Sequence, residues 1–299
     1  MFESGPAPYA EMKKRSNLFL GIGGGVLIFL VFLNFSLWQE VLASRYSTLV
    51  FFDIGQGDAS FVETPQGHQI LIDGGRDSKI VEKLEQFMAP SDKTIDLVLL
   101  SHPASDHVTG LLSVLKEYQV KHVVWTGVQK DTRVYGQWLD VLEEEKKEGA
   151  RVSLISAPSR IWIQKTSCPQ YFDILFPSED LSDTIVKDDN DTSIVAKGVF
   201  CDHTALFTGD LTSKGEKLVL KTGFDVQSDI LKVGHHGSKT SSSSAFLKAV
   251  APEYAVIQVG KDNQYGHPHE EVLERLREYG IQVMRNDELG DIIFKIKSK

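Results

Sequence analysis

Histidine and aspartate residues recur in this sequence at the ends of short apolar segments, a pattern that suits metal binding. The segment Ser101–His107 directly follows such a segment and carries two imidazoles and a carboxylate. Ligands at strand ends can converge on one point while the strands hold them in place. Imidazole together with carboxylate suits zinc or manganese. The candidate metal ligands are His102, Asp106, His107, Asp210 and His235.

The pattern gains weight from its repetition along the chain. Taken alone, the two histidines of Ser101–His107 are equally well explained as capping or surface residues, because short motifs match by chance. Asp210, however, closes a Thr-Gly-Asp segment, and His235 and His236 end another apolar run. His267 lies in a Tyr-Gly-His-Pro loop after a third. Several strand ends that each carry a ligand predict one shared site.

The adjacent histidines His235 and His236 cannot both face the same way on a strand. One should therefore bind the metal while the other faces substrate or solvent, and the sequence does not decide between them. We assign His235 to the metal. His236 or His267 is then available to protonate a leaving oxygen, and Asp106 to bind the metal and orient a water molecule.

A second group of polar residues is expected to support this site. We predict that Asp58 and Asp73 orient the metal-binding histidines from behind, whereas turn chemistry alone accounts for Asp53. Ser238 and Asn263 are candidate substrate contacts, with Ser238 close to a helix start that could bind phosphate. The alternative for Ser238 and the serines after it is that they cap that helix.

The elements needed to position these residues follow from the apolar pattern, which predicts an α+β fold built as an αββα sandwich. Helical spacing and short β patterns define the individual elements. The expected helices are 78–88, 110–118, 135–147, 213–221, 245–250 and 270–279. The expected strands are 48–53, 59–63, 69–72, 96–100, 123–125, 171–176, 193–200, 204–207, 230–233, 254–259, 282–284 and 291–296. The segments ending at Asp73 and Asp210 look like equivalent arms of two halves.

Composition narrows the classes of function. The 299 residues carry a formal net charge of -9, which disfavours broad, non-specific binding to nucleic acid but leaves room for a local basic groove. Only two cysteines are present, which argues against a disulfide framework and against a cysteine-ligated zinc site. Antiparallel pairing of 171–176 with 193–200 would place Cys168 across from Cys201. We predict a disulfide there, the alternative being two small buried apolar side chains.

The N-terminal region predicts a membrane anchor. Residues 18–38 are almost unbrokenly apolar, long enough as a helix for a bilayer core of about 30 Å. By the positive-inside rule, the basic run 13–15 would hold residues 1–17 in the cytoplasm. We therefore expect a single-pass protein of the cell membrane, with a domain over 46–299 outside the cytoplasm. The alternative is a cleaved signal peptide, with small residues at 41 and 43 near the cleavage site.

Short segments in a fixed order also carry a resemblance to a known family. They are Phe52–Ala59, Ile72–Gly75, His102–His107, Phe207–Asp210, Leu231–Ser238 and Asn263–Pro268. The sequence resembles the metallo-β-lactamase superfamily, and most closely the extracytoplasmic domain of the DNA-uptake protein ComEC. The resemblance does not extend to the multi-span channel of ComEC, because this chain has one candidate span.

The sequence departs from the superfamily pattern in two places. The usual first motif is His-x-His-x-Asp-His, and Ala104 replaces its second histidine. The histidine expected before the Thr-Gly-Asp segment is also missing, and Asn190–Ser193 resembles the ComEC-like substitute. Both departures remove ligands of the first of the family's two metals.

Mapped by resemblance, the first metal keeps His102 and Asp210. The positions of the second metal are Asp106, His107, Asp210 and one of the two adjacent histidines. We therefore expect one tightly bound zinc or manganese ion and at most a weak second one. Three or four protein ligands with an open position are the pattern of catalytic sites.

The function these observations favour is metal-dependent hydrolysis, most simply of a phosphodiester. The resemblance implies DNA, while a small phosphodiester of the cell envelope remains open. One alternative is hydrolysis of a lactone or lactam. Another is a non-catalytic ComEC-like binding domain that partners a DNA-uptake channel, an option to which Ala104 gives weight because metal sites depend on a full ligand set.

Overall fold

The computed structural model describes residues 28–34, 46–182 and 184–297, and the chain divides into two units, Met1–Arg45 and Tyr46–Lys299. Of the anchor predicted over 18–38, only 28–34 is described, as a helix, and the rest lies outside the described residues. No helix within the described ranges is long and apolar enough to span a bilayer. The structure thus gives the anchor no support, and it stays a prediction.

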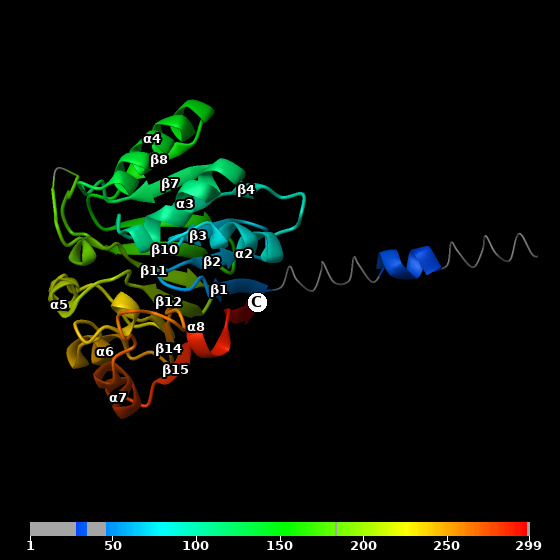
Figure 1. The fold of residues 1–299 in the computed structure, drawn as a ribbon. Helices are drawn as coiled ribbons and strands as arrows, with labels where there is room; N and C mark the ends of the chain where they lie inside the picture. Colours follow the sequence, from blue (N-terminus) through cyan, green and yellow to red (C-terminus); the bar gives the residue numbers. More distant parts are fainter. Residues whose placement is uncertain (1–27, 35–45, 183, 298–299) are drawn as a thin grey trace, which may run out of the picture. The chain divides into compact units, whose positions relative to one another are not determined.

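The described residues of the second unit form two seven-stranded sheets, seen in Figure 1. The first has the order β16-β1-β2-β3-β5-β7-β8. Its strands are β1 (Tyr46–Phe51), β2 (Ser60–Glu63), β3 (Gln69–Ile72), β5 (Leu97–Leu99), β7 (His122–Trp125), β8 (Arg151–Leu154) and β16 (Ile292–Lys297). A separate two-stranded ribbon pairs β4 (Thr94–Ile95) with β6 (Gln119–Val120).

The second sheet has the order β15-β14-β13-β12-β11-β10-β9. Its strands are β9 (Ser159–Gln164), β10 (Gln170–Phe176), β11 (Val195–Phe200), β12 (His203–Phe207), β13 (Ile230–Lys232), β14 (Tyr254–Ile257) and β15 (Gln282–Arg285). In each sheet an antiparallel set is followed by three parallel strands: β3 precedes β5, and β12 precedes β13. The two arms predicted to be equivalent, which end at Asp73 and Asp210, therefore occupy corresponding places.

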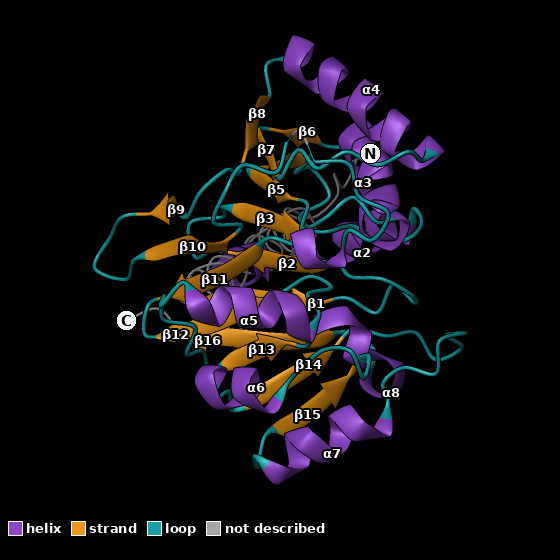
Figure 2. Cartoon of the chain, turned by 90° about the vertical axis from the view of Figure 1, so that its left-hand side faces the viewer, coloured by secondary structure: helices purple, strands orange, loops and turns teal. Residues whose placement is uncertain are grey.

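Helices cover the outer faces of the sheets, so the predicted αββα sandwich is confirmed. The helices are α2 (Lys79–Phe87), α3 (Ser105–Glu117), α4 (Arg133–Glu148), α5 (Ser213–Lys221), α6 (Ser244–Val250), α7 (Glu270–Glu278) and α8 (Asn286–Leu289). The first three pack on the first sheet, and α5, α6 and α7 pack on the second, as Figure 2 shows.

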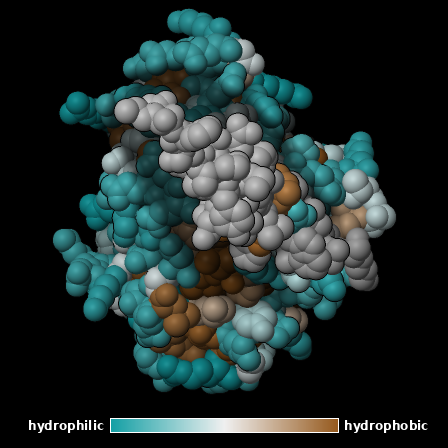
Figure 3. Space-filling view, turned by 90° about the vertical axis from the view of Figure 1, so that its right-hand side faces the viewer, coloured by the Kyte–Doolittle hydropathy of each residue, from teal (hydrophilic) through white to brown (hydrophobic). Residues whose placement is uncertain are grey.

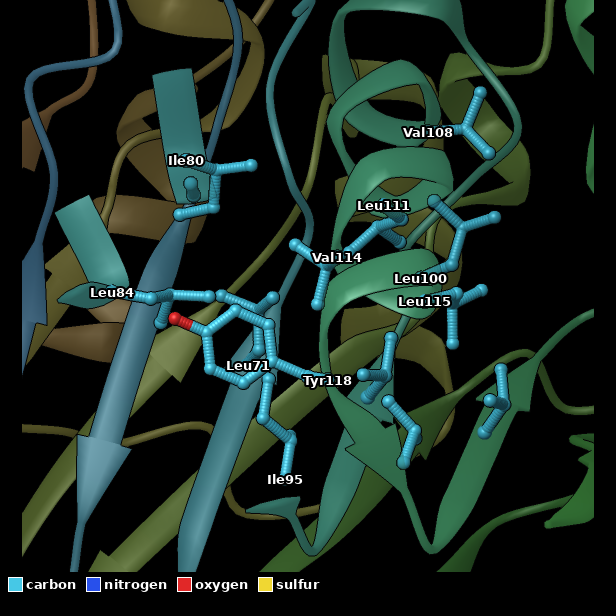
Figure 4. Close-up of a cluster of buried hydrophobic side chains, with 14 of the residues drawn as sticks. Leu71, Ile80, Leu84, Ile95, Leu100, Val108, Leu111, Val114, Leu115 and Tyr118 are labelled. Carbon is cyan, nitrogen blue, oxygen red and sulfur yellow. The ribbon is translucent and has the colours of Figure 1, made fainter. Parts of the chain in front are cut away.

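Apolar side chains fill the space between the layers. Phe51 of the first sheet stacks on Phe207 of the second, with ring centroids 5.9 Å apart, in the core between the sheets. Along β3, Ile70 points into that core while Leu71 packs under the helices (Figure 4). Burial on both faces explains why Ile70, Leu71 and Ile72 are consecutive apolar residues and do not alternate with polar ones.

Helix α3 begins earlier than the pattern predicted. The predicted helix spans 110–118, but α3 runs over Ser105–Glu117 with Ala104 as its N-cap. Its first turn is polar, so sequence periodicity assigned that turn to a loop. As a result, Asp106 and His107 lie on a rigid helical turn, which fixes their directions more firmly than a loop would.

Two edge regions were also missed. Strands β8 and β9 have largely exposed side chains, because β8 is an edge strand of the first sheet and β9 of the second. An exposed edge strand lacks the apolar signal on which the prediction relied.

The surface of the domain is mostly hydrophilic on the face shown in Figure 3, with an apolar area in its lower half. Large apolar side chains that remain exposed include Leu289 of α8 and Ile293 of β16. Scattered exposed apolar residues are normal on globular domains, and these carry no functional argument.

Candidate metal centre

The predicted ligands converge at one end of the sandwich, where parallel strands of both sheets terminate. His102 follows β5, and Asp106 and His107 lie on the first turn of α3. Asp210 follows β12, and His236 lies in the short turn η2 (Gly234–Gly237) after β13. Residues from both halves of the chain therefore meet, as the sequence predicted.

The innermost contacts join two imidazoles to two carboxylates. His107 Nε2 lies 3.4 Å from Asp210 Oδ1, and His236 Nε2 lies 3.4 Å from Asp210 Oδ2. His236 Nε2 is also 3.5 Å from Asp106 Oδ2. These separations exceed a normal charged hydrogen bond of about 2.7–2.9 Å. They match ligand atoms around a tetrahedral ion, which lie roughly 3.4 Å apart when each bond is about 2.1 Å.

The far side of each ring determines which nitrogen faces the centre. His107 Nδ1 lies 2.9 Å from Asp73 Oδ2, and His236 Nδ1 donates to the carbonyl of Gln258 at 2.9 Å. Ser101 Oγ donates to Asp73 at 2.7 Å and so accepts from His102 Nδ1 at 3.0 Å. With Nδ1 engaged in each ring, all three Nε2 atoms are directed to the centre.

The three Nε2 atoms provide the test of whether a metal fits. Those of His102, His107 and His236 are buried and have no hydrogen-bond partner among the described residues, and the same holds for Asp210 Oδ1. Buried polar atoms are rarely left without partners. Converging imidazole nitrogens and carboxylate oxygens are the donor set of a divalent transition-metal ion, so the residues present fit such an ion.

Among the described residues, four groups of three place ligand atoms close enough together to hold an ion, and two of these groups do not include Asp58. Asp106, His107 and His236 form one group, and His102, His107 and Asp210 form another. Asp210 also contacts the imidazoles of His107 and His236, so it can serve as a fourth ligand of the first group. The second group then shares His107 and Asp210 with the first, and only His102 belongs to it alone.

The assignment of the adjacent histidines is reversed by the geometry. His235 belongs to none of the ligand groups in the described residues, and its Nδ1 contacts Thr240 Oγ1 at 3.4 Å. The strand predicted over 230–233 ends in the structure at Lys232, before the two histidines. Both histidines adopt left-handed backbone angles, with φ of 50° and 52°. Strand alternation therefore does not apply, and this tight turn directs His236 to the centre while His235 is left at the rim.

Asp58 and Asp73 lie where they were predicted, behind the ligand rings. Asp58 Oδ1 is 3.2 Å from His236 Nδ1, and its other oxygen forms an ion pair with Lys232. Lys232 was not predicted. It is 2% exposed, its Nζ donates to the carbonyl of Gly209 at 2.8 Å, and Nζ lies 3.6 Å from Asp210 Oδ1. The available signal was a lysine inside the otherwise apolar run Ile230–Val233.

Close packing brings the site's backbone segments together. A Cβ atom on Gly57, which has a φ of 104°, would lie 1.9 Å from the carbonyl oxygen of Asp106. A Cβ on Gly110 would lie 1.8 Å from the carbonyl oxygen of Gly74. Only glycine permits such approaches, so these two positions hold α3 against the loops beside the metal centre.

Charges in the centre shift its acidities strongly. Burial lowers the pKa of His107 and of His236, but the surrounding carboxylates, Asp210 foremost, outweigh burial and raise both pKa values well above the usual value. Burial raises the pKa of Asp106, yet the two imidazoles keep it below its usual value. Burial likewise lowers the pKa of Lys232, but Asp58 and Asp210 raise it overall, so this ammonium stays charged.

His267 lies beside the centre as predicted, with its ring stacked 6.4 Å from that of His236. Burial and the neighbouring histidines lower the pKa of His267 to about 4. The imidazole is therefore neutral near pH 7 and is not in the protonated form that a general acid needs. The predicted role as an acid that protonates a leaving group is not favoured by this environment.

The two predicted substrate contacts are instead occupied within the protein. Asn263 Nδ2 donates to the carbonyls of Gly260 and His267, and its Oδ1 accepts from the His267 amide at 2.9 Å. Ser238 is 5% exposed, and its Oγ lies 3.0 Å from Thr240 Oγ1. Both side chains hold loops in place, and the cap of α6 is Ser243.

The segment that replaces the missing histidine supports Asp210. Ser193 Oγ accepts from the Asp210 amide at 3.1 Å and donates to the carbonyl of Asn190 at 2.7 Å. Asp191 Oδ1 accepts from the amides of Thr212 and Gly215 at the start of α5. Asn190–Ser193 thus fixes the backbone around a ligand.

This fold and site define a class of protein, and the chain belongs to the metallo-β-lactamase superfamily, whose family model matches residues 52–261. The metallo-hydrolase Igni18 from Ignicoccus hospitalis has the same fold, with a TM-score of 0.51 and 14% identity over 84% of this chain and 100% of that one.

More specific relatives are competence proteins. ComE operon protein 3 of Bacillus subtilis is 30% identical over 96% of this chain and 38% of its own length. Competence protein ComA of Neisseria gonorrhoeae is 34% identical over 85% of this chain and 33% of its own length. The resemblance to the ComEC family is therefore confirmed, and the chain spans less than two fifths of these relatives.

Proposed function

We propose that this chain hydrolyses phosphodiesters with a divalent ion held by Asp106, His107, Asp210 and His236. The observation that carries the proposal is the convergence of buried, unpartnered imidazole nitrogens and carboxylate oxygens at the spacing of a tetrahedral ion. An ion bound there would supply hydroxide near neutral pH and polarise a phosphoryl oxygen. A weaker second ion would lie beside His102, where Ala104 supplies no ligand atom.

The protein's own groups divide the remaining work. Asp106 has the most exposed carboxylate of the ligand set, at 26%, so we place the substrate's approach on its side. The side chains of the other three proposed ligands, His107, Asp210 and His236, are 5% exposed or less. Neutral His267 is suited to accept a hydrogen bond from the attacking water, and His235 lies at the rim, where it can contact a phosphate oxygen. Lys232 holds Asp58 and Asp210 in their ionised forms.

DNA is the substrate we propose within this class, because the relatives are named as competence proteins. We further propose that the domain is tethered by residues 18–38 outside the cytoplasm and works beside a DNA-uptake channel. These two proposals concern proteins of which this chain spans only a part.

The test is metal content and hydrolysis of bis(p-nitrophenyl) phosphate by the full chain, with manganese or zinc added back. We expect about one tightly bound equivalent, and loss of both binding and activity in His107→Ala. His203→Ala is the matched control, because His203 is exposed and lies on β12 away from the site. A metal-loaded protein without phosphodiesterase activity would favour the non-catalytic binding domain. Turnover of a chromogenic lactam would favour a lactone or lactam hydrolase.

A further inference from the structure

A hollow of about 380 Å³ lies beside the metal centre. Three segments line it: the turn at Gly55 and Gln56, the start of α2 with Arg76 and Lys79, and the loop 260–265. Gly260 packs so closely on the turn that a Cβ there would lie 2.8 Å from the Gly55 carbonyl carbon. The walls of the hollow are therefore in firm contact with each other.

Aromatic rings connect the hollow to the metal centre. The ring of Tyr265, which is 65% exposed, stacks on His267 with centroids 5.7 Å apart and an interplanar angle of 26°. His267 in turn stacks on His236 at 30°. On the other wall, the turn leads directly to Asp58, whose amide donates to the carbonyl of Asp106 at 3.3 Å. A molecule in the hollow is thus a close neighbour of anything bound at the ion.

The charge of the hollow opposes that of the chain. Arg76 and Lys261 are exposed and make no hydrogen bond or ion pair with any residue that the structure describes. Lys79 has only a loose contact, 3.9 Å, with Asp53, whose carboxylate also accepts from the Gly55 amide. Asp53 and Asp262 are the carboxylates of the lining, so cations predominate there, although the chain carries -9 overall.

We propose that this hollow binds the nucleotide adjacent to the scissile phosphodiester of a single-stranded oligonucleotide. The base stacks on Tyr265, and the next phosphate lies against Arg76 and Lys261. Base stacking on an exposed aromatic ring combined with nearby cations is how proteins hold single strands without reading their sequence. A duplex hides its base faces, so the ring selects for unpaired nucleotides. The inference rests on the proposed phosphodiesterase function.

The first experiment measures binding of a fluorescein-labelled oligothymidylate of about 12 nucleotides to the full chain by anisotropy, in EDTA so that no hydrolysis occurs. We expect Tyr265→Ala to weaken binding by about tenfold and Tyr265→Phe to retain it, because the ring does the stacking. The double variant Arg76→Ala/Lys261→Ala should weaken binding similarly and lower the salt dependence by about 0.7 per lost phosphate contact.

The matched control is Trp162→Ala/Lys165→Ala, which removes an exposed ring and a cation from the region of β9, the far edge of the second sheet. It should leave binding unchanged. Equal loss in this control, wild-type binding by Tyr265→Ala, or equally tight binding of a duplex through the same residues would overturn the proposal.

Hydrolysis of bis(p-nitrophenyl) phosphate separates this inference from the proposed function, because that substrate is too small to occupy both places. The Tyr265 and Arg76/Lys261 variants should keep this activity within about twofold while their KM for the oligonucleotide rises in proportion to the lost affinity. Site-dependent oligonucleotide binding without any hydrolysis would refute the enzyme and support the subsite. Hydrolysis by a protein whose oligonucleotide binding is unaffected by these variants would support the enzyme and refute the subsite.

Discussion

Asp73 lies behind the metal centre and contacts the far side of the His107 ring. Its carboxylate accepts from the Ser101 amide and hydroxyl, both at 2.7 Å, and pairs with His107 Nδ1 at 2.9 Å. The residue has a left-handed φ of 58°, a conformation that disfavours non-glycine residues by about 1–2 kcal/mol. These three contacts offset that strain and fix the direction of a ligand ring.

We expect Asp73→Asn to weaken metal binding by about 10–100-fold, because the amide no longer presents two anionic oxygens to Ser101 and His107. Chelator competition would measure the dissociation constant. Asp77→Asn, at an exposed position nearby in the sequence, should bind as the wild type does. Unchanged affinity in Asp73→Asn would show that the contact does not orient His107.

Protons compete with the metal at this site. The raised pKa values of His107 and His236 mean that both imidazoles hold a proton near pH 7 when no ion is bound. Binding must release those protons, so affinity should rise with pH, by up to about tenfold per pH unit for each proton displaced. Calorimetric titrations in buffers of different ionisation enthalpy would detect the release. Buffer-independent heats together with a flat affinity between pH 6 and about 8 would contradict this assignment.

At the scale of elements, the antiparallel pair β10–β11 is closed by the predicted disulfide between Cys168 and Cys201, which is confirmed. Gln170 pairs with Phe200, so each cysteine lies just beyond the paired residues. The bond closes a loop of sequence separation 33 on the side of the second sheet away from α7 and β15. It therefore supports a strand pair that carries no ligand of the metal centre.

Replacing both cysteines by serine should lower the free energy of unfolding by roughly 3–4 kcal/mol, the chain-entropy value for a loop of this length. Urea denaturation of the full chain would measure the change. Metal binding at 25 °C should be retained, because the ligands lie on other elements. A loss of metal affinity comparable to that in His107→Ala would indicate that the disulfide positions the site after all.

Considered as a whole molecule, the metal centre joins the two halves of the sandwich. His102, Asp106 and His107 come from the first half, and Asp210 and His236 come from the second. A ligand that binds only the folded state stabilises it by mass action. An ion at this place should therefore stabilise both sheets together and not one of them locally.

We expect metal at about 100 times its dissociation constant to add about 2.7 kcal/mol of stability. For a domain of this size that raises Tm by roughly 5–10 °C, in a single transition. Differential scanning calorimetry with and without EDTA would measure it. Asp210→Ala should remove the difference, and two separate transitions, of which only one shifts, would refute a shared site.

The sequence by itself determined the sandwich, the order of its elements and the identity of most candidate ligands. Strand and helix periodicity depend on local burial, which β3 and α5 show clearly: Gln69–Ile72 and Ser213–Lys221 have the predicted bounds. The ligands were recognisable because histidine and aspartate recur at the ends of several apolar segments, in an order that resembles the motifs of one family. The outer positions of Asp58 and Asp73 also agree with the prediction.

Tertiary structure decided what each of these groups faces. The choice of His236 over His235 depends on left-handed backbone angles that no period expresses. The buried charge of Lys232 is tolerated only because Asp58, distant in sequence, lies against it. Asn263 is occupied by its own loop, and Tyr265 and Arg76 line the same hollow only because the chain is folded. Residue types limit which chemistry is available, but direction, desolvation and partners arise from contacts between distant segments.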